Sequence, residues 1–239
     1  MIPLSDNIRS RTIPYVNVAI ILVCIALFVY EWVDRGFADR MAFKPAYLLS
    51  RELLSVGPTF AFQTLLVSIF LHGGLLHIAS NMLALWVFGD NVEDRMGHVR
   101  YLIFYLFCGI VATLAHSLSA VFGLILNPMS LDRGLVGASG AIAGVMGAYF
   151  VLVPGASIRT LVVLFIFITI LEIPSGFFIF LWFVLQLFAG LGSILGPGAA
   201  VAYWAHIGGF VTGYILARGM NRPRRRPLPR VIEMDVRDL

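Results

Sequence analysis

Charged residues are scarce in this chain of 239 residues, of which they make up 13%, against about 25% in a typical soluble domain. Hydrophobic residues make up 59%, and the mean hydropathy is +0.91. A single core cannot hide that much apolar surface, so we infer that lipid solvates much of it. The scarcity of charge excludes a water-soluble globule and predicts an integral membrane protein.

Cysteine and lysine are scarcer still. Cys24 and Cys108 both lie within apolar runs, which indicates buried neutral thiols and no disulfide framework, metal motif or redox motif. Lys44 is the one lysine, so arginine supplies the other basic residues, with a cluster between Arg218 and Arg230. Such a cluster suits nucleic acid, but beside an apolar segment it is more typical of a cytoplasmic anchor. We therefore expect no nucleic-acid partner.

A helix that crosses a bilayer needs about 20 mostly apolar residues. The sequence has six candidate windows for such helices. They cover residues 13–33, 76–89, 101–126, 135–153, 176–195 and 201–216. Two further apolar runs, residues 64–71 and 161–171, are short for a span. We expect the first to lie in the interface or to re-enter the membrane, while the placement of the second decides between six and seven spans.

The distribution of basic residues favours six membrane spans over seven. With the N-terminus inside, six spans place 12 basic residues on inner segments and five on outer ones, as the positive-inside rule requires. The sequence thus predicts an all-α membrane protein, a compact bundle of six transmembrane helices with a long, partly membrane-embedded first external loop. We expect a cytoplasmic N-terminus (1–12), one membrane domain (13–217) and a basic cytoplasmic tail (218–239), in a bacterial inner membrane.

Carboxylates are absent from the middle of every predicted span, which disfavours a proton- or cation-coupled transporter. The spans do hold a few polar side chains: His77, Asn81, His116, Ser139, Gln186 and His206. The second, fourth and sixth spans run in the same direction, so His77, Ser139 and His206 are each expected within about the first turn or two of their helices, at the outer leaflet. Asn81 shares the helix face of His77, four residues on. Four polar side chains are therefore expected to meet at one depth.

Small residues follow both Ser139 and His206. Gly140 and Gly144 form one small-xxx-small face, and Gly209 and Gly213 form another. Helices with such faces approach closely. Close approach is what brings a serine hydroxyl within about 2.6–3.2 Å of an imidazole, the distance that an activated nucleophile needs.

The side-chain types suit acyl transfer. Serine needs a base to become a nucleophile, and His206 is the candidate base for Ser139. Since no carboxylate is at hand, the two would act as a dyad. The Asn81 amide, the His77 imidazole and the backbone amide of Ser139 are candidate donors to an oxyanion. Two alternatives stay open: these residues only bond across helices, or His72, His77 and His206 hold a metal ion.

Together these motifs closely resemble those of the rhomboid intramembrane serine proteases. The resemblance runs from about residue 64 to residue 213. It rests on His72-Gly-Gly-Leu-Leu-His77, Asn81-Met82, Phe88-Gly89, the Glu93/Arg95/Gly97 pattern, Gly137-Ala-Ser139-Gly140, and Ala205-His206 followed by Gly209-x-x-x-Gly213.

The resemblance implies a serine-type endopeptidase without cofactor or metal. Ser139 would be the nucleophile and His206 the general base, with His77, Asn81 and the Ser139 amide as the oxyanion hole. The structural positions would be Gly137, Gly140, Gly144, Gly209, Gly213, Glu93 and Arg95. Substrates would be single-span membrane proteins, cut in or near the outer end of the span. The alternative is a catalytically silent relative that binds transmembrane helices.

The resemblance also assigns the parts around the site. Residues 196–200 would cap it, and the fifth span, carrying Phe177 and Trp182, would form a lateral gate. Two features depart from the family pattern. Some members carry an aromatic residue one turn after the nucleophile that packs on the histidine; here that position is Ala143, which leaves open what orients His206. Some also carry a Trp-Arg pair in the first external loop, for which this sequence has no counterpart.

Overall fold

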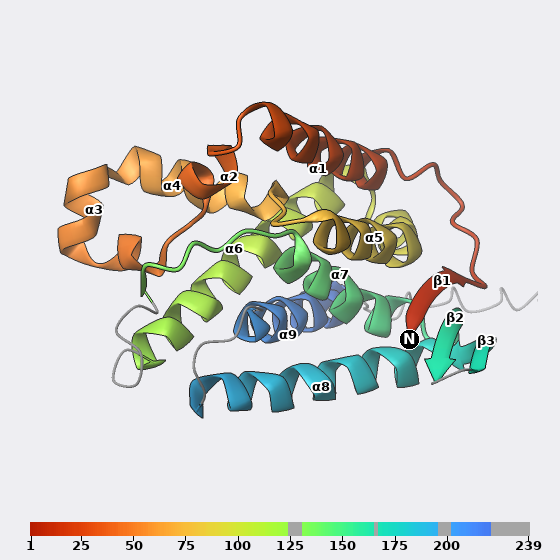
Figure 1. The fold of residues 1–239 in the computed structure, drawn as a ribbon. Coiled ribbons are helices and arrows are strands. Elements are labelled where there is room, and N and C mark those ends of the chain that lie inside the picture. The colour runs from red at the N-terminus through yellow and green to blue at the C-terminus, as the bar shows by residue number, and fades with distance from the viewer. Residues whose placement is uncertain (124–130, 165–166, 196–201, 221–239) are drawn as a thin grey trace, which may run out of the picture.

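The computed structural model describes residues 1–123, 131–164, 167–195 and 202–220. In that part of the chain a bundle of helices carries a small sheet at one end (Figure 1). The helices are α1 (Tyr15–Val33), α2 (Phe37–Met41), α3 (Ser50–Val56), α4 (Pro58–Val67), α5 (Leu75–Met96), α6 (His98–Gly123), α7 (Ser139–Leu152), α8 (Ser175–Leu195) and α9 (Tyr203–Met220). Two 3-10 turns, η1 (Pro45–Leu48) and η2 (Ser68–Phe70), lie in the region that joins α1 to α5.

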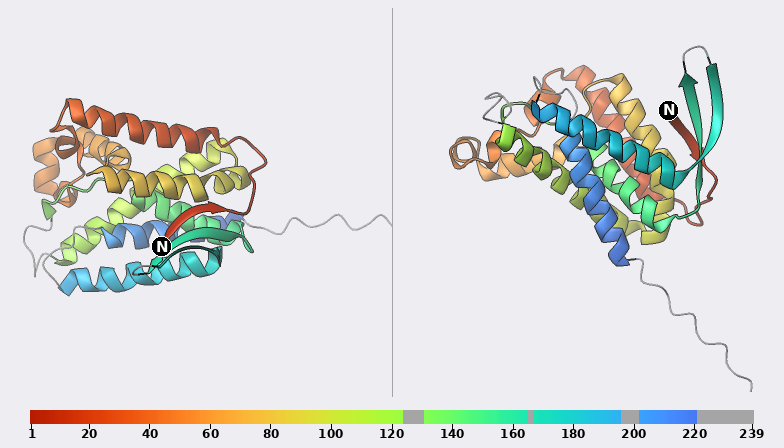
Figure 2. Two further views of the ribbon diagram at one scale, coloured as in Figure 1. Left: turned by 45° about the vertical axis from the view of Figure 1, so that its right-hand side comes forward. Right: turned by 90° about the horizontal axis from the view of Figure 1, so that it is seen from below.

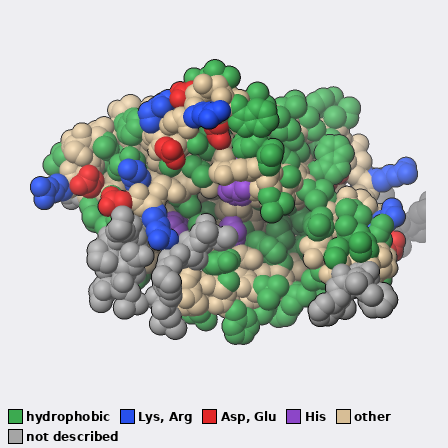
Figure 3. Space-filling model, in the orientation of Figure 1, with side chains coloured by type: hydrophobic (Ala, Val, Ile, Leu, Met, Phe, Trp, Pro, Cys, Tyr) green, Lys and Arg blue, Asp and Glu red, His purple; other side chains and the backbone are tan. Residues whose placement is uncertain are grey.

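Each predicted span overlaps one helix, which is α1, α5, α6, α7, α8 or α9 in chain order. Among the described residues, α1, α6 and α8 are each long and apolar enough to cross a membrane. The stretch Pro58–Phe70 and helix α5 meet the same criterion as a pair and are bent by 77° at their junction. Figure 3 shows hydrophobic side chains over much of the visible face, with the charged ones on its left half and at its right edge. The chain is an integral, multi-pass membrane protein, and the number of six crossings stays a prediction.

Helix α7 lies at the centre of the bundle, between α5 and α9 (Figure 1). Its residues from Gly140 to Tyr149 are all buried, as expected of a helix that is apolar all round. With 14 residues it is about 21 Å long, which is shorter than the roughly 30 Å hydrocarbon core. One end of α7 therefore lies below the membrane surface.

Glycines let α9 touch the backbone of α7. A Cβ added to Gly209 would lie 1.9 Å from the backbone oxygen of Gly140, and one added to Gly213 would lie 2.0 Å from that of Gly144. No side chain fits there, so the two backbones are in direct contact. The α9 glycine face thus packs on α7 as the sequence pattern predicts.

The α7 glycines serve a second neighbour. A Cβ added to Gly140 would lie 2.6 Å from the Cβ of Ala112, and one added to Gly144 would lie 2.6 Å from the Cβ of Cys108. Ala112 and Cys108 both belong to α6. The two glycine faces therefore do not simply face each other: α9 packs on the α7 backbone, while the missing α7 side chains make room for α6.

The apolar run at residues 161–171 forms neither a span nor a helix. It lies in an antiparallel hairpin of β2 (Ser157–Leu164) and β3 (Phe167–Pro174), and β1 (Ile2–Asp6) pairs with β2, so that the strand order is β1-β2-β3. Ser157 pairs with Pro174, so the hairpin returns the chain to the level at which it left α7. The predicted all-α bundle therefore carries a small sheet that the apolar pattern alone does not reveal.

Asp6 fastens this sheet to the helices. Its Oδ2 accepts hydrogen bonds from the Tyr149 hydroxyl at 2.5 Å and from Asn91 Nδ2 at 2.9 Å. Burial raises the pKa of the Asp6 carboxyl above its ordinary value, and the bond from Tyr149 partly opposes that shift. The N-terminal strand is thus tied to the ends of α5 and α7, at the end of the bundle where α8 begins.

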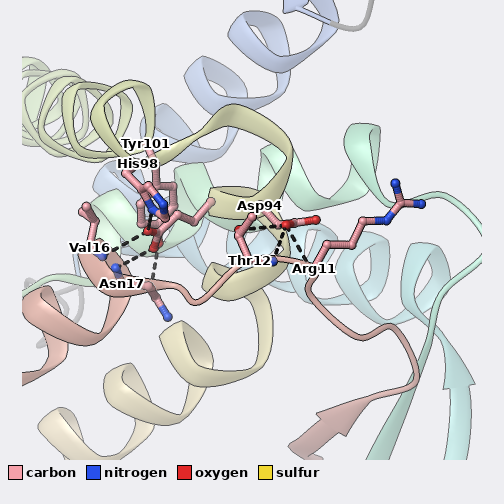
Figure 4. Close-up of polar contacts among 8 residues, drawn as sticks. Arg11, Thr12, Val16, Asn17, Asp94, His98 and Tyr101 are labelled. Carbon is pink, nitrogen blue, oxygen red and sulfur yellow. Dashed lines mark hydrogen bonds and ion pairs between the residues drawn. The ribbon is translucent and has the colours of Figure 1, made fainter.

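Two adjacent carboxylates at the end of α5 hold the start of α1 (Figure 4). Glu93, which is fully buried, accepts hydrogen bonds from the backbone amides of Val16 and Asn17 at 3.0 and 2.7 Å. Asp94 Oδ1 accepts from the backbone amide of Thr12 at 2.9 Å and from its hydroxyl at 2.8 Å. The amides of a first helical turn have no partner within the helix, so Glu93 caps α1 from another helix.

Replacing Glu93 by alanine is expected to lower the free energy of unfolding by about 2–4 kcal/mol, because the buried amide of Asn17 and the partly buried amide of Val16 lose their acceptor. Glu93→Gln keeps one acceptor oxygen and is expected to cost less. Thermal unfolding in detergent measures both. Glu52→Ala, at an exposed carboxylate on α3, is the control, and an equal loss there would contradict the capping role.

Candidate active site

A cavity of about 880 Å³ lies at the end of the bundle opposite the sheet. The first turns of α5, α7 and α9 line it, together with α8, through residues that include His77, Asn81, Ser139, Trp182 and His206. Figure 3 shows histidine side chains within a hollow of the visible face. The polar residues that the sequence places at one depth therefore do share one cavity, and it opens where the short helix α7 begins.

Ser139 and His206 are in hydrogen-bond contact. Ser139 is the first residue of α7, and its Oγ lies 2.8 Å from Nε2 of His206, in the first turn of α9. Gly140 and Gly209 follow them closely in the chain and make the backbone contact described above. The glycine packing thus fixes the spacing between hydroxyl and imidazole.

The other nitrogen of His206 contacts α8. Its Nδ1 lies 2.7 Å from Oε1 of Gln186. Trp182, one turn earlier on the same face of α8, lies beside the imidazole with ring centroids 5.9 Å apart. Ala143 has no ring to pack on His206, so α8 supplies the aromatic contact to this histidine through Trp182. In the sequence, the only sign of a role for Gln186 is that it is a polar residue inside an apolar span.

His77 and Asn81 bring hydrogen-bond donors to the cavity. The Gly73 amide donates to Nδ1 of His77 at 3.4 Å, which leaves Nε2 to carry the ring proton. Asn81 is buried, and its Nδ2 has no hydrogen-bond partner among the described residues. Gly137 lies directly against the His77 ring: it has a φ of 138°, and an added Cβ would approach the ring to 3.0 Å. Only glycine fits this position.

The start of α7 adds backbone donors. The amides of a first helical turn, here including that of Ser139, have no acceptor within the helix and form the positive end of its dipole. The first residues of α7 line the same cavity as His77, Asn81 and the Ser139 hydroxyl. The arrangement holds the parts of acyl-transfer chemistry: a hydroxyl, a base, and donors for a developing negative charge.

Some predicted parts lie elsewhere. His72 is 1% exposed, bonds to the Phe70 carbonyl and does not line the cavity, although its ring contacts that of His77. Phe177 is exposed on the outer surface of α8. The described residues hold no group of three metal-ligating side chains. The predicted cap at 196–200 and most of the tail at 218–239 fall outside the described residues.

Comparison with known proteins gives a consistent result. The model of the Rhomboid domain matches residues 59–222. Rhomboid protease GluP of Bacillus subtilis is 31% identical over 163 residues, 67% of this chain and 26% of that protein. RHOMBOID-like protein 4 of Arabidopsis thaliana is 34% identical over 147 residues, 61% of this chain and 31% of that protein. The mitochondrial Rhomboid protein 1 of Saccharomyces cerevisiae is 30% identical over 172 residues, which cover 67% of this chain and 44% of that protein.

The chain thus spans less than half the length of these relatives. The matched residues nevertheless include all of α5 to α9, and so every side chain that lines the cavity next to Ser139. On the motifs, the bundle and this match, the chain belongs to the rhomboid family.

Proposed function

We propose that this protein is an intramembrane serine endopeptidase that cuts single-span membrane proteins in or near the outer end of their transmembrane segment. The observation that carries the proposal is the line of contacts from Ser139 Oγ to His206 and on to Gln186, within a cavity where Asn81 Nδ2 has no hydrogen-bond partner among the described residues. One protein of this family with matching sequence is named a protease. The proposed membrane is a bacterial inner membrane, with both chain ends inside.

The contacts support a mechanism with an acyl-enzyme intermediate. Nε2 of His206 takes the proton of the Ser139 hydroxyl while Oγ attacks the scissile carbonyl. The oxyanion forms next to the first-turn amides of α7, the imidazole of His77 and the Asn81 amide group, which are already oriented and so stabilise it without reorganisation. His206 then gives the proton to the leaving amine, and the peptide bond breaks.

Deacylation needs water at membrane depth. The cavity is large enough to hold several water molecules, and a polar opening above the short α7 is where irregular backbone and water are tolerated in a membrane protein. Water attacks the acyl carbonyl while Nε2 of His206 takes its proton, and the proton returns to Ser139 Oγ as the acid product leaves. Because a helix hides its carbonyls, the substrate must unwind locally before Ser139 can reach the bond.

The test is cleavage of a single-span reporter by the purified protein in detergent, with the cut located by mass spectrometry. A serine-directed fluorophosphonate is added in parallel, and its attachment site is mapped. We expect one cut near the outer end of the reporter span and labelling at Ser139. Binding of the reporter with neither cleavage nor labelling would instead support the silent helix-binding relative.

A further inference from the structure

We propose that Gln186 is a positioning residue that completes the Ser139–His206 pair from α8, an inference that rests on the proposed function. A dyad that lacks a carboxylate still needs something to hold the imidazole in one orientation and one tautomer. The 2.7 Å contact between Gln186 Oε1 and His206 Nδ1 meets that need, because a carbonyl oxygen only accepts hydrogen bonds.

The direction of this bond decides the chemistry. When Oε1 accepts, Nδ1 carries the ring proton and Nε2 has its lone pair free for the Ser139 hydroxyl, 2.8 Å away. If Nδ1 had no acceptor, the other tautomer would place a proton on Nε2, and His206 would no longer act as a base toward Ser139. Gln186 therefore selects the productive tautomer without adding a charge to the membrane interior.

Helix α8 supplies a second constraint at the same point. Trp182 and Gln186 are four residues apart and share one face of α8, and the Trp182 ring lies against the imidazole. One side chain fixes the ring nitrogen and the other the ring face. Trp182 and Gln186 take the place of the aromatic residue that some family members carry at the position of Ala143. The dyad is consequently aligned only while α8 is seated against α9.

Three variants test the positioning role in the reporter assay. Gln186→Met keeps the size but removes the strong acceptor, Gln186→Glu keeps the acceptor and adds charge, and Leu185→Ala is the control at a neighbouring position that faces outward and is 54% exposed. Measurements are kcat, KM, fluorophosphonate labelling rate and the pH–rate profile between about pH 5 and 9.

For Gln186→Met we expect kcat to fall about 10- to 100-fold with little change in KM, less than the roughly 10⁴-fold loss when a triad carboxylate is replaced. Gln186→Glu is expected to keep most of kcat and to move the acidic limb of the profile to higher pH, because a carboxylate stabilises the imidazolium. Leu185→Ala should match the parent protein.

Unchanged kcat in Gln186→Met, or a Gln186→Glu variant that is as slow as Gln186→Met with an undisplaced pH profile, overturns the positioning role. Failure of the proposed function looks different: the parent protein is then inactive, or Ser139→Ala cuts as fast as the parent.

A separate observation concerns the β2–β3 hairpin, and we infer that it lies in the headgroup region of the bilayer. Its strands expose apolar side chains at Val163, Ile168, Ile170 and Leu171, with Ile168 70% exposed. Ile170 and Leu171 are neighbours and so point to opposite faces. Both faces of β3 are therefore apolar, which in water would favour aggregation of an edge strand.

Lipid is the occupant that the placement favours. β3 continues directly into α8, whose Phe177 and Phe180 are exposed on the lipid-facing side, so the apolar surface of the helix runs on into the hairpin. Figure 2 shows the hairpin projecting sideways from the end of the bundle. Its charged pair, Arg159 opposite Glu172, lies near the base. The unpaired edge of β3 needs polar partners, which places it among headgroups and not in the hydrocarbon core.

Site-directed spin labelling of the full chain in phospholipid vesicles, at a low protein-to-lipid ratio, tests this placement. Cys24 and Cys108 are fully buried, so a nitroxide can be attached selectively at Ile168→Cys. Phe188→Cys, on the exposed side of α8, is the lipid reference, and Arg9→Cys, at an exposed position after β1, is the water reference.

Collision rates with oxygen and with a water-soluble nickel complex report the depth of each label. At position 168 we expect a ratio of oxygen to nickel collisions between those of the two references. A ratio equal to that of the Arg9 site shows the hairpin in water and overturns the inference. Exclusion of both reagents shows the face covered by protein, such as a second copy, and overturns it equally.

Discussion

Replacing Ser139 or His206 by alanine is expected to lower the cleavage rate by about 10⁴-fold or more, because the nucleophile and base of a serine protease act as a unit. For the same reason the double variant should be no slower than either single one. Gel analysis of reporter cleavage measures the rates, and thermal unfolding in detergent shows that the fold persists.

Fluorophosphonate labelling separates the two roles. Ser139→Ala should take up no label, since it lacks the attacked oxygen, while His206→Ala should label slowly because its hydroxyl has lost the base. Ser117→Ala is the matched control: this serine also lies inside a membrane helix, but its hydroxyl only donates to the Thr113 carbonyl of its own helix. Cleavage by Ser139→Ala at the rate of the Ser117→Ala control would contradict the proposed nucleophile.

Gly209→Ala is expected to have the largest effect among changes that leave the polar residues intact. Its new Cβ would lie 1.9 Å from the backbone oxygen of Gly140, so α9 must move away from α7. We expect a loss of about 3 kcal/mol or more in the free energy of unfolding, at the upper end of overpacking costs. Gly209 is three residues from His206 and Gly140 is next to Ser139, so the dyad should widen, and about 1 Å of misplacement costs about 10²-fold in rate.

Gly219→Ala is the control on the same helix. No other atom of the described residues, apart from the neighbouring backbone of α9 itself, lies within 4 Å of the Cβ added there, and alanine favours a helix more than glycine by about 1 kcal/mol. Stability and activity should therefore be unchanged or slightly raised. Equal losses at positions 209 and 219 would mean that α9 tolerates no alanine for reasons other than contact with α7.

Local pattern and charge were enough to place the polar residues at one depth. Helix periodicity puts Asn81 on the face of His77, and the arginine bias sets the direction of α5, α7 and α9. These features depend on neighbours in sequence and on the membrane. The same is true of the α9 glycine face at Gly209, which marks a close contact wherever the partner helix lies.

Contacts between segments that are far apart in the sequence could not be predicted from local pattern and charge. The run at residues 161–171 is apolar without a period of two or 3.6, so only its pairing across the hairpin and with β1 decided its form. Glu93 caps α1 by accepting hydrogen bonds from Val16 and Asn17, which lie 77 and 76 positions before it in the sequence.

The sequence by itself determined a membrane bundle with Ser139, His206, His77 and Asn81 at one level, because span length, charge bias and helix period are local properties. Only the tertiary structure decided what holds His206. The rotation of α8 about its axis and its seat against α9 bring Gln186 and Trp182 to the imidazole, and side-chain packing across several helices, which no single segment encodes, sets that rotation.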